Sequence, residues 1–532
     1  MRALTTLNAN SLTLTSPLQI TQTLTIGSAG NLVTGGNALT LLSSSTGTAL
    51  VVNSGTGTVQ GAATVQRYID GSLNAGLGYR HYSAPVAGAT VGSLATSGFA
   101  PVLTPGYNTS ATPGTTRPFP NVFAYDQRRL STTTNNLPVF DKGFVVPASG
   151  DALAPGRGYA VNISAGELVS FVGSPNNGDL TLNLSRNNDA TAADAGWALV
   201  GNPYPAPLDY SLVTATDRPG LDAAAYVVQS TGQYAGGYRS YLNGLSTDAT
   251  NNPLIASGQG FFVRVSQGNA SGSLTFRNGQ RVTTYASQVA FQRPAADLRP
   301  LVRLELAGAG LADAWVAYAE ASAAAAFDGQ SDAAKLPNST GLNLSSTAGA
   351  VNLAIDGRPA FTAATVLPLA VGVPAAGSYT LAALTLANLP AGLTAYLHDA
   401  HTGQLVPLAP GSSYAFSVTA AAAQTLLTGR FSVQFTAAAP LATAPAQPAS
   451  QVSVYPNPAH TGFTVTVPGV VGATVVQAEL LNALGQVVHR QQAALPVAGA
   501  LLPVATAGLA PGIYTLRLAA GGTLTTKRIT VQ

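Results

Sequence analysis

The stretch QYAGGYRSYLNG, residues 233–244, is the most suggestive candidate for a binding surface in this sequence. Tyrosine rings offer a flat apolar face and a hydroxyl group with few rotatable bonds, which suits contacts with glycans or with other proteins. Tyrosine is also a routine strand residue, so the alternative, which we favour, is that these side chains pack the interior of their own domain. The candidate binding residues are Tyr234, Tyr238, Arg239, Tyr241 and Asn243.

Metal ligation has weaker support. His398 and His401 are close enough in sequence to share a metal ion, but a zinc site needs a third ligand and a rigid support. The surrounding YLHDAHTGQL also fits a strand, an Asp-initiated turn closed by Thr-Gly, and a second strand, and we favour this interpretation. We therefore expect no metal centre and no cofactor.

Two aspartate pairs raise the question of calcium. Asp328 and Asp332 lie in FDGQSDAAKL, and Asp189 and Asp194 lie in NNDATAAD. A calcium loop takes oxygen ligands at alternate positions, and both pairs are too sparse for that pattern. A structural calcium ion in a loop stays open as an alternative.

Catalytic motifs are scarce. Only four of the 21 acidic residues are glutamates, and the remaining 17 aspartates leave open the pair of carboxylates that a glycosidase needs, although no local motif nominates one. Neither a Gly-x-Ser-x-Gly motif nor a Gly-Lys pair occurs, which removes the nucleophile elbow and the phosphate-binding loop. No catalytic residue is assigned, and the motifs favour a protein that is not an enzyme.

Composition sets the fold class. Of 532 residues, 46% are hydrophobic and only 8% are charged, and 56 glycines and 34 prolines break the chain into short runs. Short β-branched runs between Gly, Pro and Asn predict an all-β, multidomain protein. With a net charge of +3 and no basic run longer than Arg128–Arg129, the chain lacks the footprint of a nucleic-acid-binding protein. Cysteine is absent, so stability must come from the sheets without disulfides.

The chain divides into five parts. Residues 1–61 are β-solenoid-like repeats, with an irregular β-meander as the alternative, and they resemble the tail of a longer solenoid. A duplicated β-rich domain spans 62–293, a β-sandwich of seven or eight strands spans 294–436, and a Pro/Ala linker spans 437–450. Residues 451–532 form the last domain.

The sequence predicts neither a signal peptide nor a transmembrane helix. The N-terminal residues lack the continuous apolar core of a signal peptide, so we expect the natural chain to begin upstream. The most apolar late stretch is interrupted by Pro496, Pro503 and Pro511, so no transmembrane segment is expected.

The duplication within residues 62–293 rests on three segments that recur in the same order. RHYSAPV, VFAYD and PGRGYAVNIS in the first half correspond to WALVGNPYP, AAYVVQS and SGQGFFVRVS in the second. A Gly-x-Gly turn precedes the last strand of each half, and we expect Gly156, Gly158, Gly258 and Gly260 to supply positive φ angles there. These turns lack the strand–helix context of a dinucleotide-binding loop.

The last domain opens with YPNPA, residues 455–459. Pro456 and Pro458 hold the residues before them, Tyr455 and Asn457, in extended conformations. Alternation in FTVTV, a hairpin with Gly485 as its left-handed turn residue and a closing hairpin together predict a small sandwich of about seven strands.

This domain resembles the type A C-terminal sorting domain of the type IX secretion system of Bacteroidota. The matching motifs are YPNPA (455–459), LLNALGQVV (480–488), LAPGIYTLRL (509–518) and TTKRITVQ (525–532). Its sorting-motif residues would be Tyr455, Pro456, Asn457, Pro458, Gly485, Gly512 and Tyr514. The resemblance implies an immunoglobulin-like fold, recognition by the type IX secretion machinery, and an extracellular or outer-membrane surface location. In this family the domain is commonly cleaved, and the body is attached to lipopolysaccharide or released.

Two classes of function remain open. The leading hypothesis is a secreted or surface-anchored, non-enzymatic protein with an adhesive or structural role, supported by stacked β-domains with polar Thr, Asn and Ser faces. The alternative is a carbohydrate-active enzyme or a glycan-binding module, which would need carboxylates in a tyrosine-lined groove of residues 62–436. Besides the secretion machinery, the expected partners are surface lipopolysaccharide or extracellular glycans.

Overall fold

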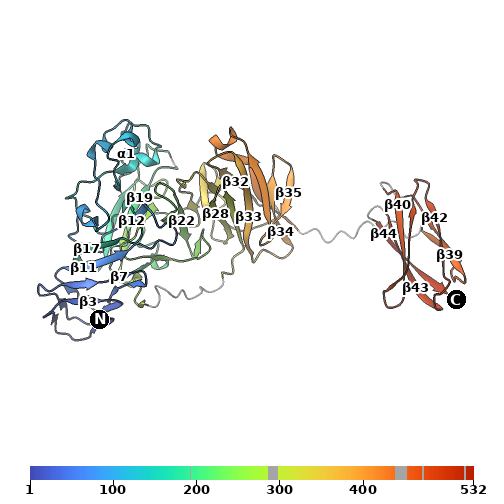
Figure 1. Ribbon diagram of the computed structural model, residues 1–532, viewed down its shortest axis with the longest axis horizontal. Coiled ribbons are helices and arrows are strands. Elements are labelled where there is room, and N and C mark those ends of the chain that lie inside the picture. Colours follow the sequence, from blue (N-terminus) through green and yellow to red (C-terminus); the bar gives the residue numbers. More distant parts are fainter. Residues whose placement is uncertain (192, 286–296, 438–451, 470–472, 521–522) are drawn as a thin grey trace. The chain divides into compact units, whose positions relative to one another are not determined.

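Two compact units make up the computed structural model, residues 1–437 and residues 438–532 (Figure 1). It describes residues 1–191, 193–285, 297–437, 452–469, 473–520 and 523–532. Strands dominate both units, which confirms the all-β, multidomain fold class. The helices of the described ranges are short, like α1 (Arg129–Thr132), and none has the length and apolarity that crossing a bilayer requires. All but the first residue of the predicted linker lies outside the described residues.

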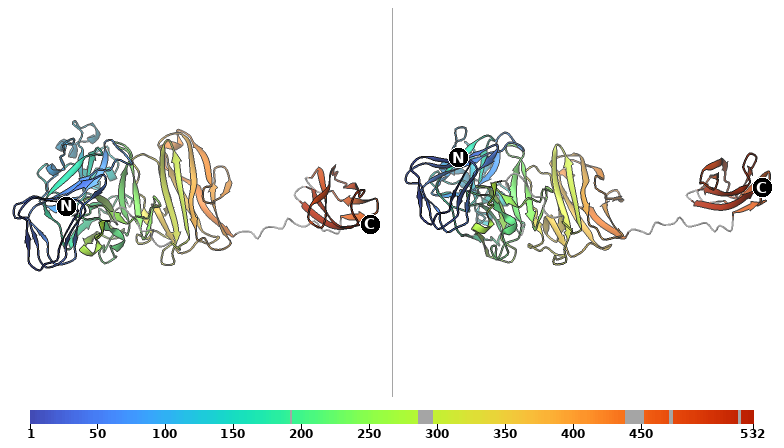
Figure 2. Two further views of the ribbon diagram at one scale, coloured as in Figure 1. Left: turned by 60° about the horizontal axis from the view of Figure 1, so that its bottom comes forward. Right: turned by 90° about the horizontal axis from the view of Figure 1, so that it is seen from below.

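Residues 3–68 form three rungs of a parallel β-solenoid, dark blue in Figure 2. The three sheets are β1 (Ala3–Thr6), β4 (Thr23–Ile26) and β9 (Leu50–Asn53); β2 (Leu12–Thr13), β5 (Leu32–Val33) and β10 (Val59–Gln60); and β3 (Leu18–Ile20), β6 (Leu39–Leu41) and β11 (Ala63–Tyr68). Alternate apolar side chains point inward, so Leu24 and Ile26 are fully buried. The solenoid-like repeats are confirmed, and their third rung extends to Tyr68, beyond the expected boundary at residue 61.

Glycine permits close stacking of the rungs at one corner of the solenoid. A Cβ atom at Gly30 would collide with the backbone of Asn8, and one at Gly57 would collide with the backbone of Gly30. The far edge of the third rung is covered, because β11 pairs antiparallel with β17 (Leu168–Pro175). The solenoid and the duplicated region therefore share one sheet.

The duplicated region contains two sheets with the same strand order. The first is β12 (Gly78–Tyr82), β16 (Tyr159–Ile163), β14 (Val122–Tyr125) and β15 (Phe144–Val145); the second is β19 (Trp197–Gly201), β25 (Gly260–Arg264), β21 (Ala225–Ser230), β22 (Gly236–Leu242) and β23 (Leu245–Ser246). The recurring segments of the sequence fall on β12 and β19, on β14 and β21, and on β16 and β25. Repetition in the sequence therefore corresponds to repetition in the fold.

The two Gly-x-Gly turns use their glycines in two ways. Gly156 and Gly258 have positive φ angles of 79° and 69°, as predicted. Gly158 and Gly260 do not have positive φ angles, so that part of the prediction is wrong. Close approach explains them instead, because a Cβ atom at Gly158 would lie 2.5 Å from the carbonyl oxygen of Val200.

Each turn docks on the first strand of the opposite half. Isolated antiparallel bridges pair Tyr82 with Gln259 and Arg157 with Val200. The same pairing thus occurs twice, so the turn of the second half lies beside β12 and the turn of the first half lies beside β19.

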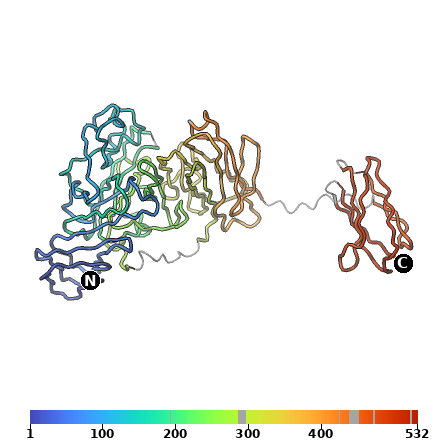
Figure 3. The backbone as a smooth tube through the Cα atoms, in the orientation of Figure 1, coloured from blue at the N-terminus to red at the C-terminus, as the bar shows by residue number. Residues whose placement is uncertain are grey.

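Residues 301–437 form one sheet of eleven strands around a shared core. Figure 3 traces the backbone of this part in yellow and orange. Its order is β35 (Gln404–Pro407), β34 (Leu393–Asp399), β37 (Leu427–Ala437), β32 (Val366–Gly372), β30 (Asn343–Ala348), β31 (Val351–Arg358), β28 (Leu311–Ala319), β27 (Leu301–Gly308), β33 (Gly377–Ala387) and β36 (Ser413–Val418), with β29 (Ala333–Ala334) beside β31. Phe416 of β36 packs against Phe431 of β37 with ring centroids 4.7 Å apart, so the sheet curls over itself. The layers face each other as in the expected sandwich, but hydrogen bonding connects them without a break.

The second unit is a seven-stranded sandwich with its own core. One sheet is β38 (Ser453–Tyr455), β39 (Gly462–Val467) and β42 (Ala500–Ala505); the other is β41 (Val487–Ala494), β40 (Val475–Leu481), β43 (Gly512–Ala520) and β44 (Thr523–Val531). Inward residues such as Val465, Leu480 and Leu502 are fully buried. The number of strands and the hairpin turn at Gly485, with φ of 78°, agree with the sequence prediction.

Candidate functional site

The hairpin that the sequence singled out places one tyrosine on the surface. Tyr234 lies in the turn between β21 and β22, and 57% of its surface is exposed. Tyr238, on β22, is half-buried against Phe262 with ring centroids 6.0 Å apart, and burial raises the pKa of its hydroxyl. Tyr234 is therefore the more exposed of these two rings.

Of the other three candidates, two are buried and the third, Asn243, is exposed but hydrogen-bonded within the protein. Arg239 is buried and donates a hydrogen bond to the carbonyl of Asn252 at 2.5 Å, and Tyr241 is buried. Asn243, which has a positive φ of 47°, donates to the carbonyl of Gln330 at 2.9 Å. The five predicted residues therefore do not form one surface.

Tyr234 lines a cavity of about 340 Å³ in the first unit. Its ring packs edge-on against Phe119, with centroids 6.3 Å apart. Asn162 also lines this cavity; its amide donates to the carbonyl of Gln233 at 2.8 Å, while its buried side-chain oxygen accepts no hydrogen bond from the described residues. None of the described residues around the cavity is acidic. The cavity thus joins an aromatic wall to an unsatisfied acceptor.

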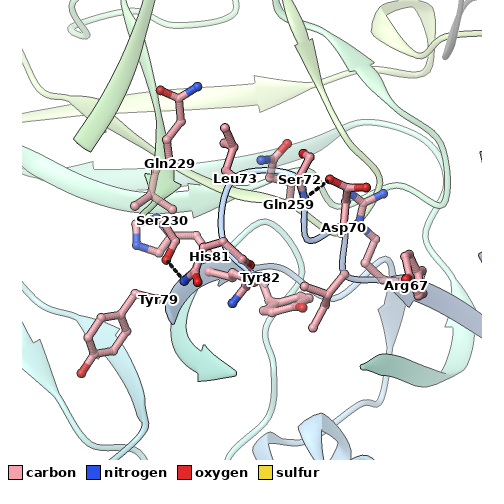
Figure 4. A pocket seen from close by; sticks show the side chains of 16 residues that line it. Arg67, Asp70, Ser72, Leu73, Tyr79, His81, Tyr82, Gln229, Ser230 and Gln259 are labelled. Carbon is pink, nitrogen blue, oxygen red and sulfur yellow. Dashed lines mark hydrogen bonds between the residues drawn. The ribbon is translucent and has the colours of Figure 1, made fainter. Parts of the chain in front are cut away.

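A second cavity, of about 210 Å³, lies where the turn at Gln259 meets β12. Figure 4 shows Arg67, Asp70 and Gln259 at one end of it and Tyr79, His81 and Ser230 at the other. His81 is buried, and this burial lowers its pKa to about 3, so the ring is neutral at physiological pH. Sequence reasoning missed this site, although a charged residue at an inward position of the strand in TVQRYI was a signal of it.

A third cavity, of about 520 Å³, occupies the equivalent place in the other half. There β19 replaces β12, the turn at Arg157 replaces the turn at Gln259, and residues after β14 replace the end of β21. Of its charged residues, Arg128 and Asp126 form an ion pair at 2.8 Å, whereas Arg157 forms no ion pair with a described residue and donates a hydrogen bond to the carbonyl of Asn183 at 3.4 Å.

Two carboxylates meet in only one of the four cavities described, a space of about 660 Å³ lined by Asp222 and Asp328. Asp222 is 1% exposed, and burial raises its pKa. Arg264 lies 3.9 Å from its carboxylate, and a Cβ atom at Gly329 would collide with the same group. The backbone of the loop therefore covers Asp222 closely.

The histidine pair that suggested a metal site belongs to a turn. Asp399, between the two, is 1% exposed and accepts hydrogen bonds from Arg430 at 3.0 and 3.1 Å and from Tyr414 at 2.9 Å. It also accepts one from the backbone N–H of His401 at 2.9 Å. Within the described residues, no group of three or more His, Asp or Glu side chains is placed to hold a metal ion.

The aspartates considered for calcium form local turns. Asp332 accepts hydrogen bonds from the backbone N–H groups of Asp328 and Gly357 at 2.8 and 2.7 Å. Asp194 accepts one from the hydroxyl of Thr191 at 2.5 Å, and Asp189 lies on the surface. Their oxygens are thus engaged by the protein itself or remain apart.

In the second unit, the YPNP motif is tied to the last strand. The side-chain oxygen of Asn457 accepts a hydrogen bond from the backbone N–H of Thr530 at 2.8 Å, and its amide donates to the carbonyl of Arg528 at 3.0 Å. Ala459 follows in a parallel bridge with Val531. Tyr455, by contrast, is 81% exposed. Pro456 and Pro458 flank the anchored asparagine.

The remaining motif residues close the sandwich. Tyr514 is buried and donates its hydroxyl hydrogen bond to the carbonyl of Ala510 at 2.8 Å, across Gly512 at the start of β43. On the outer face of this sheet Glu479 forms ion pairs with Arg490 at 2.6 Å and with Arg517. These motifs are thus structural parts of one compact domain.

Two family models match the chain. The model described as "Secretion system C-terminal sorting domain" matches residues 453–532, which confirms the type IX sorting domain. The model described as "Domain of unknown function (DUF8693)" matches residues 2–435. The chain belongs to the DUF8693 family. No curated protein matches this DUF8693 chain. Its sorting domain implies interaction with the type IX secretion machinery and export to an extracellular or cell-surface location.

Proposed function

We propose that this exported protein is a non-enzymatic adhesin-like protein of a Bacteroidota cell surface, whose body binds extracellular glycans around Tyr234. The exposed ring of Tyr234 beside an unsatisfied buried acceptor is the observation that carries the proposal. Aromatic faces stack on the apolar faces of sugar rings, and a buried amide oxygen without a donor favours a ligand that brings a hydroxyl group. Anchoring of the body to surface lipopolysaccharide is part of the same proposal.

A carbohydrate-active enzyme is the alternative, and Asp222 with Asp328 is the observation that favours it. Glycosidases need two carboxylates that flank one bond, one of them with a raised pKa. Asp222 has the raised pKa, but Arg264 and the backbone at Gly329 crowd its carboxylate. This crowding leaves no open approach for a glycosidic oxygen, so we rank binding above hydrolysis.

A polysaccharide panel tests the proposal on the purified full chain. We expect saturable binding of at least one polysaccharide, and a loss of affinity of at least tenfold in Tyr234→Ala. Tyr455→Ala is the matched control, because it removes the other highly exposed tyrosine, from the sorting domain. Equal binding by Tyr234→Ala, or binding by no polysaccharide, would contradict the proposal. Release of reducing ends that stops in Asp328→Asn would support the enzyme instead.

A further inference from the structure

The cavity beside β12 contains a cation without a partner. Side chains alternate along a strand, so Arg67 shares the inward-facing side of β11 with Ala63 and Val65, which are 2% and 1% exposed. Ile69, the next residue on that side, is 4% exposed. Arg67 thus takes a position where an apolar residue would continue the core.

No described residue offers Arg67 a hydrogen bond or an ion pair. The carboxylate that acts on it is that of Asp70, which is exposed and accepts a hydrogen bond from the backbone N–H of Ser72 at 2.9 Å. Burial lowers the pKa of the guanidinium, while Tyr82 and Asp70 act in the opposite direction. The side chain of Arg67 is half-buried, so water solvates its charge only in part, and an anionic ligand would reduce the remaining penalty that the free protein carries.

Arg80, the second arginine of the cavity, is hydrogen-bonded to backbone carbonyls of the protein. It donates hydrogen bonds to the carbonyls of Asn74 at 2.7 Å and Gly78 at 3.2 Å, and to that of Ile163. These bonds fix the loop that forms one wall of the cavity. Arg67 therefore remains the cation available to a ligand.

The other polar groups of the cavity are suited to hydroxyls. The side-chain oxygen of Gln259 accepts from the backbone N–H of Ala256 at 2.9 Å, which leaves its amide as a donor. Tyr82 and Ser230 also line the space, and the hydroxyl of Ser230 already donates to the carbonyl of Gly232 at 3.1 Å and accepts from the amide of Asn74 at 3.1 Å. A guanidinium surrounded by amide and hydroxyl groups matches a ligand that carries one planar anion and several hydroxyl groups.

The charges favour a monoanion over a phosphate. A dianion would face the single charge of Arg67 and the opposing charge of Asp70, whereas a carboxylate matches the fork of one guanidinium. The volume of about 210 Å³ suits a single small unit of a ligand.

We propose that the cavity around Arg67 binds the carboxylate of an acidic sugar unit, such as a hexuronate. This inference rests on the proposed function, and it names the class of glycan unit that the body recognises. Arg67 holds the carboxylate, and Gln259 and Tyr82 contact the hydroxyl groups. In the equivalent cavity of the other half, Arg128 is paired with Asp126 and Arg157 donates a hydrogen bond to the carbonyl of Asn183, so the proposal assigns the carboxylate to the cavity around Arg67.

Calorimetric titration of the full chain with D-glucuronate, D-glucose and inorganic phosphate tests this inference. We expect one saturable site for glucuronate, no measurable binding of glucose, and weaker binding of phosphate. Arg67→Gln should lower the affinity for glucuronate at least tenfold, and Arg128→Gln, the matched control, should leave it unchanged. Asp70→Asn should increase the affinity, because it removes the opposing charge.

Several results would overturn the inference. They are absence of glucuronate binding to the wild-type chain, equal binding by Arg67→Gln, or tighter binding of phosphate than of glucuronate. Thermal unfolding of Arg67→Gln shows whether the variant is folded, and Arg67→Lys, which keeps the charge but loses the fork, should bind with intermediate affinity. Polysaccharide binding that depends on Tyr234 without any preference for acidic units would refute this inference alone. Glucuronate binding by a chain that binds no polysaccharide would refute the proposed function alone.

Discussion

The YPNP motif of the sorting domain combines an anchor and an exposed side chain, and substitution separates them. Asn457 makes two hydrogen bonds to β44, and each such bond contributes about 0.5–1.5 kcal/mol to stability. Both lie at the surface, where water competes, so we expect Asn457→Ala to lower the free energy of unfolding by about 1–2 kcal/mol. For a domain of this size that corresponds to a melting temperature lower by roughly 4–8 °C per kcal/mol.

Urea unfolding of residues 452–532, which have their own core, measures this loss. Asn457→Asp keeps the acceptor for Thr530 but not the donor to Arg528, so its loss should be smaller than that of Asn457→Ala. Tyr455→Ala removes an 81% exposed side chain and should change stability by less than about 0.5 kcal/mol. A stable Asn457→Ala domain together with a destabilised Tyr455→Ala domain would refute the reasoning.

Three further predictions concern the body. Burial lowers the pKa of His81 to about 3, whereas an unfolded histidine titrates near about 6.5, so the unfolded state gains stability as the pH falls from 6.5 towards 3. Urea unfolding should therefore show a loss of up to about 1.4 kcal/mol per pH unit in that window, and His81→Phe should flatten this dependence. Gly258→Ala should lower the free energy of unfolding by about 1–2 kcal/mol, because alanine is strained at a φ of 69°. Thermal unfolding measures this loss, and Gly260→Ser, where the added side chain collides with its neighbours, is the comparison. Asp399→Asn should lower the free energy of unfolding, measured in urea, by about 2–3 kcal/mol, because it leaves the guanidinium of Arg430 without its carboxylate partner.

Local patterns predicted much of the fold. The sorting domain was identifiable because its motifs fix local turns, as with Gly485, and pack within about eighty residues of one another. The solenoid was identifiable because alternation repeats at each rung. Alternation does not encode which strand pairs with which, however, so a sandwich and a single curled sheet look the same in the sequence. Only the pairing of β30 with both β31 and β32 shows that the layers are continuous.

The candidate site was harder to predict because its parts come from distant segments. On β22 alternation places Tyr238 and Tyr241 on opposite faces, but only the packing of both faces shows that Tyr241 is buried and Tyr238 half-buried. Tyr234 is exposed because it lies in the turn and not on the strand. Arg67 was visible as a charge at an inward position, whereas the turn at Gln259 that completes its cavity lies far along the chain.

Duplication explains why the body has a pair of equivalent cavities with different chemistry. The Gly-x-Gly turn of each half pairs with the first strand of the other half. This pairing therefore forms two cavities, one beside β12 and one beside β19. The glycines preserve the pairing, since a side chain at Gly158 would collide with Val200. The residues around each space are free to differ, because they do not form the pairing. In one space Arg128 is paired with Asp126 and Arg157 donates a hydrogen bond to a backbone carbonyl, whereas in the other no described residue pairs with Arg67. Divergence after duplication can therefore assign a ligand to one half while the other half maintains the fold.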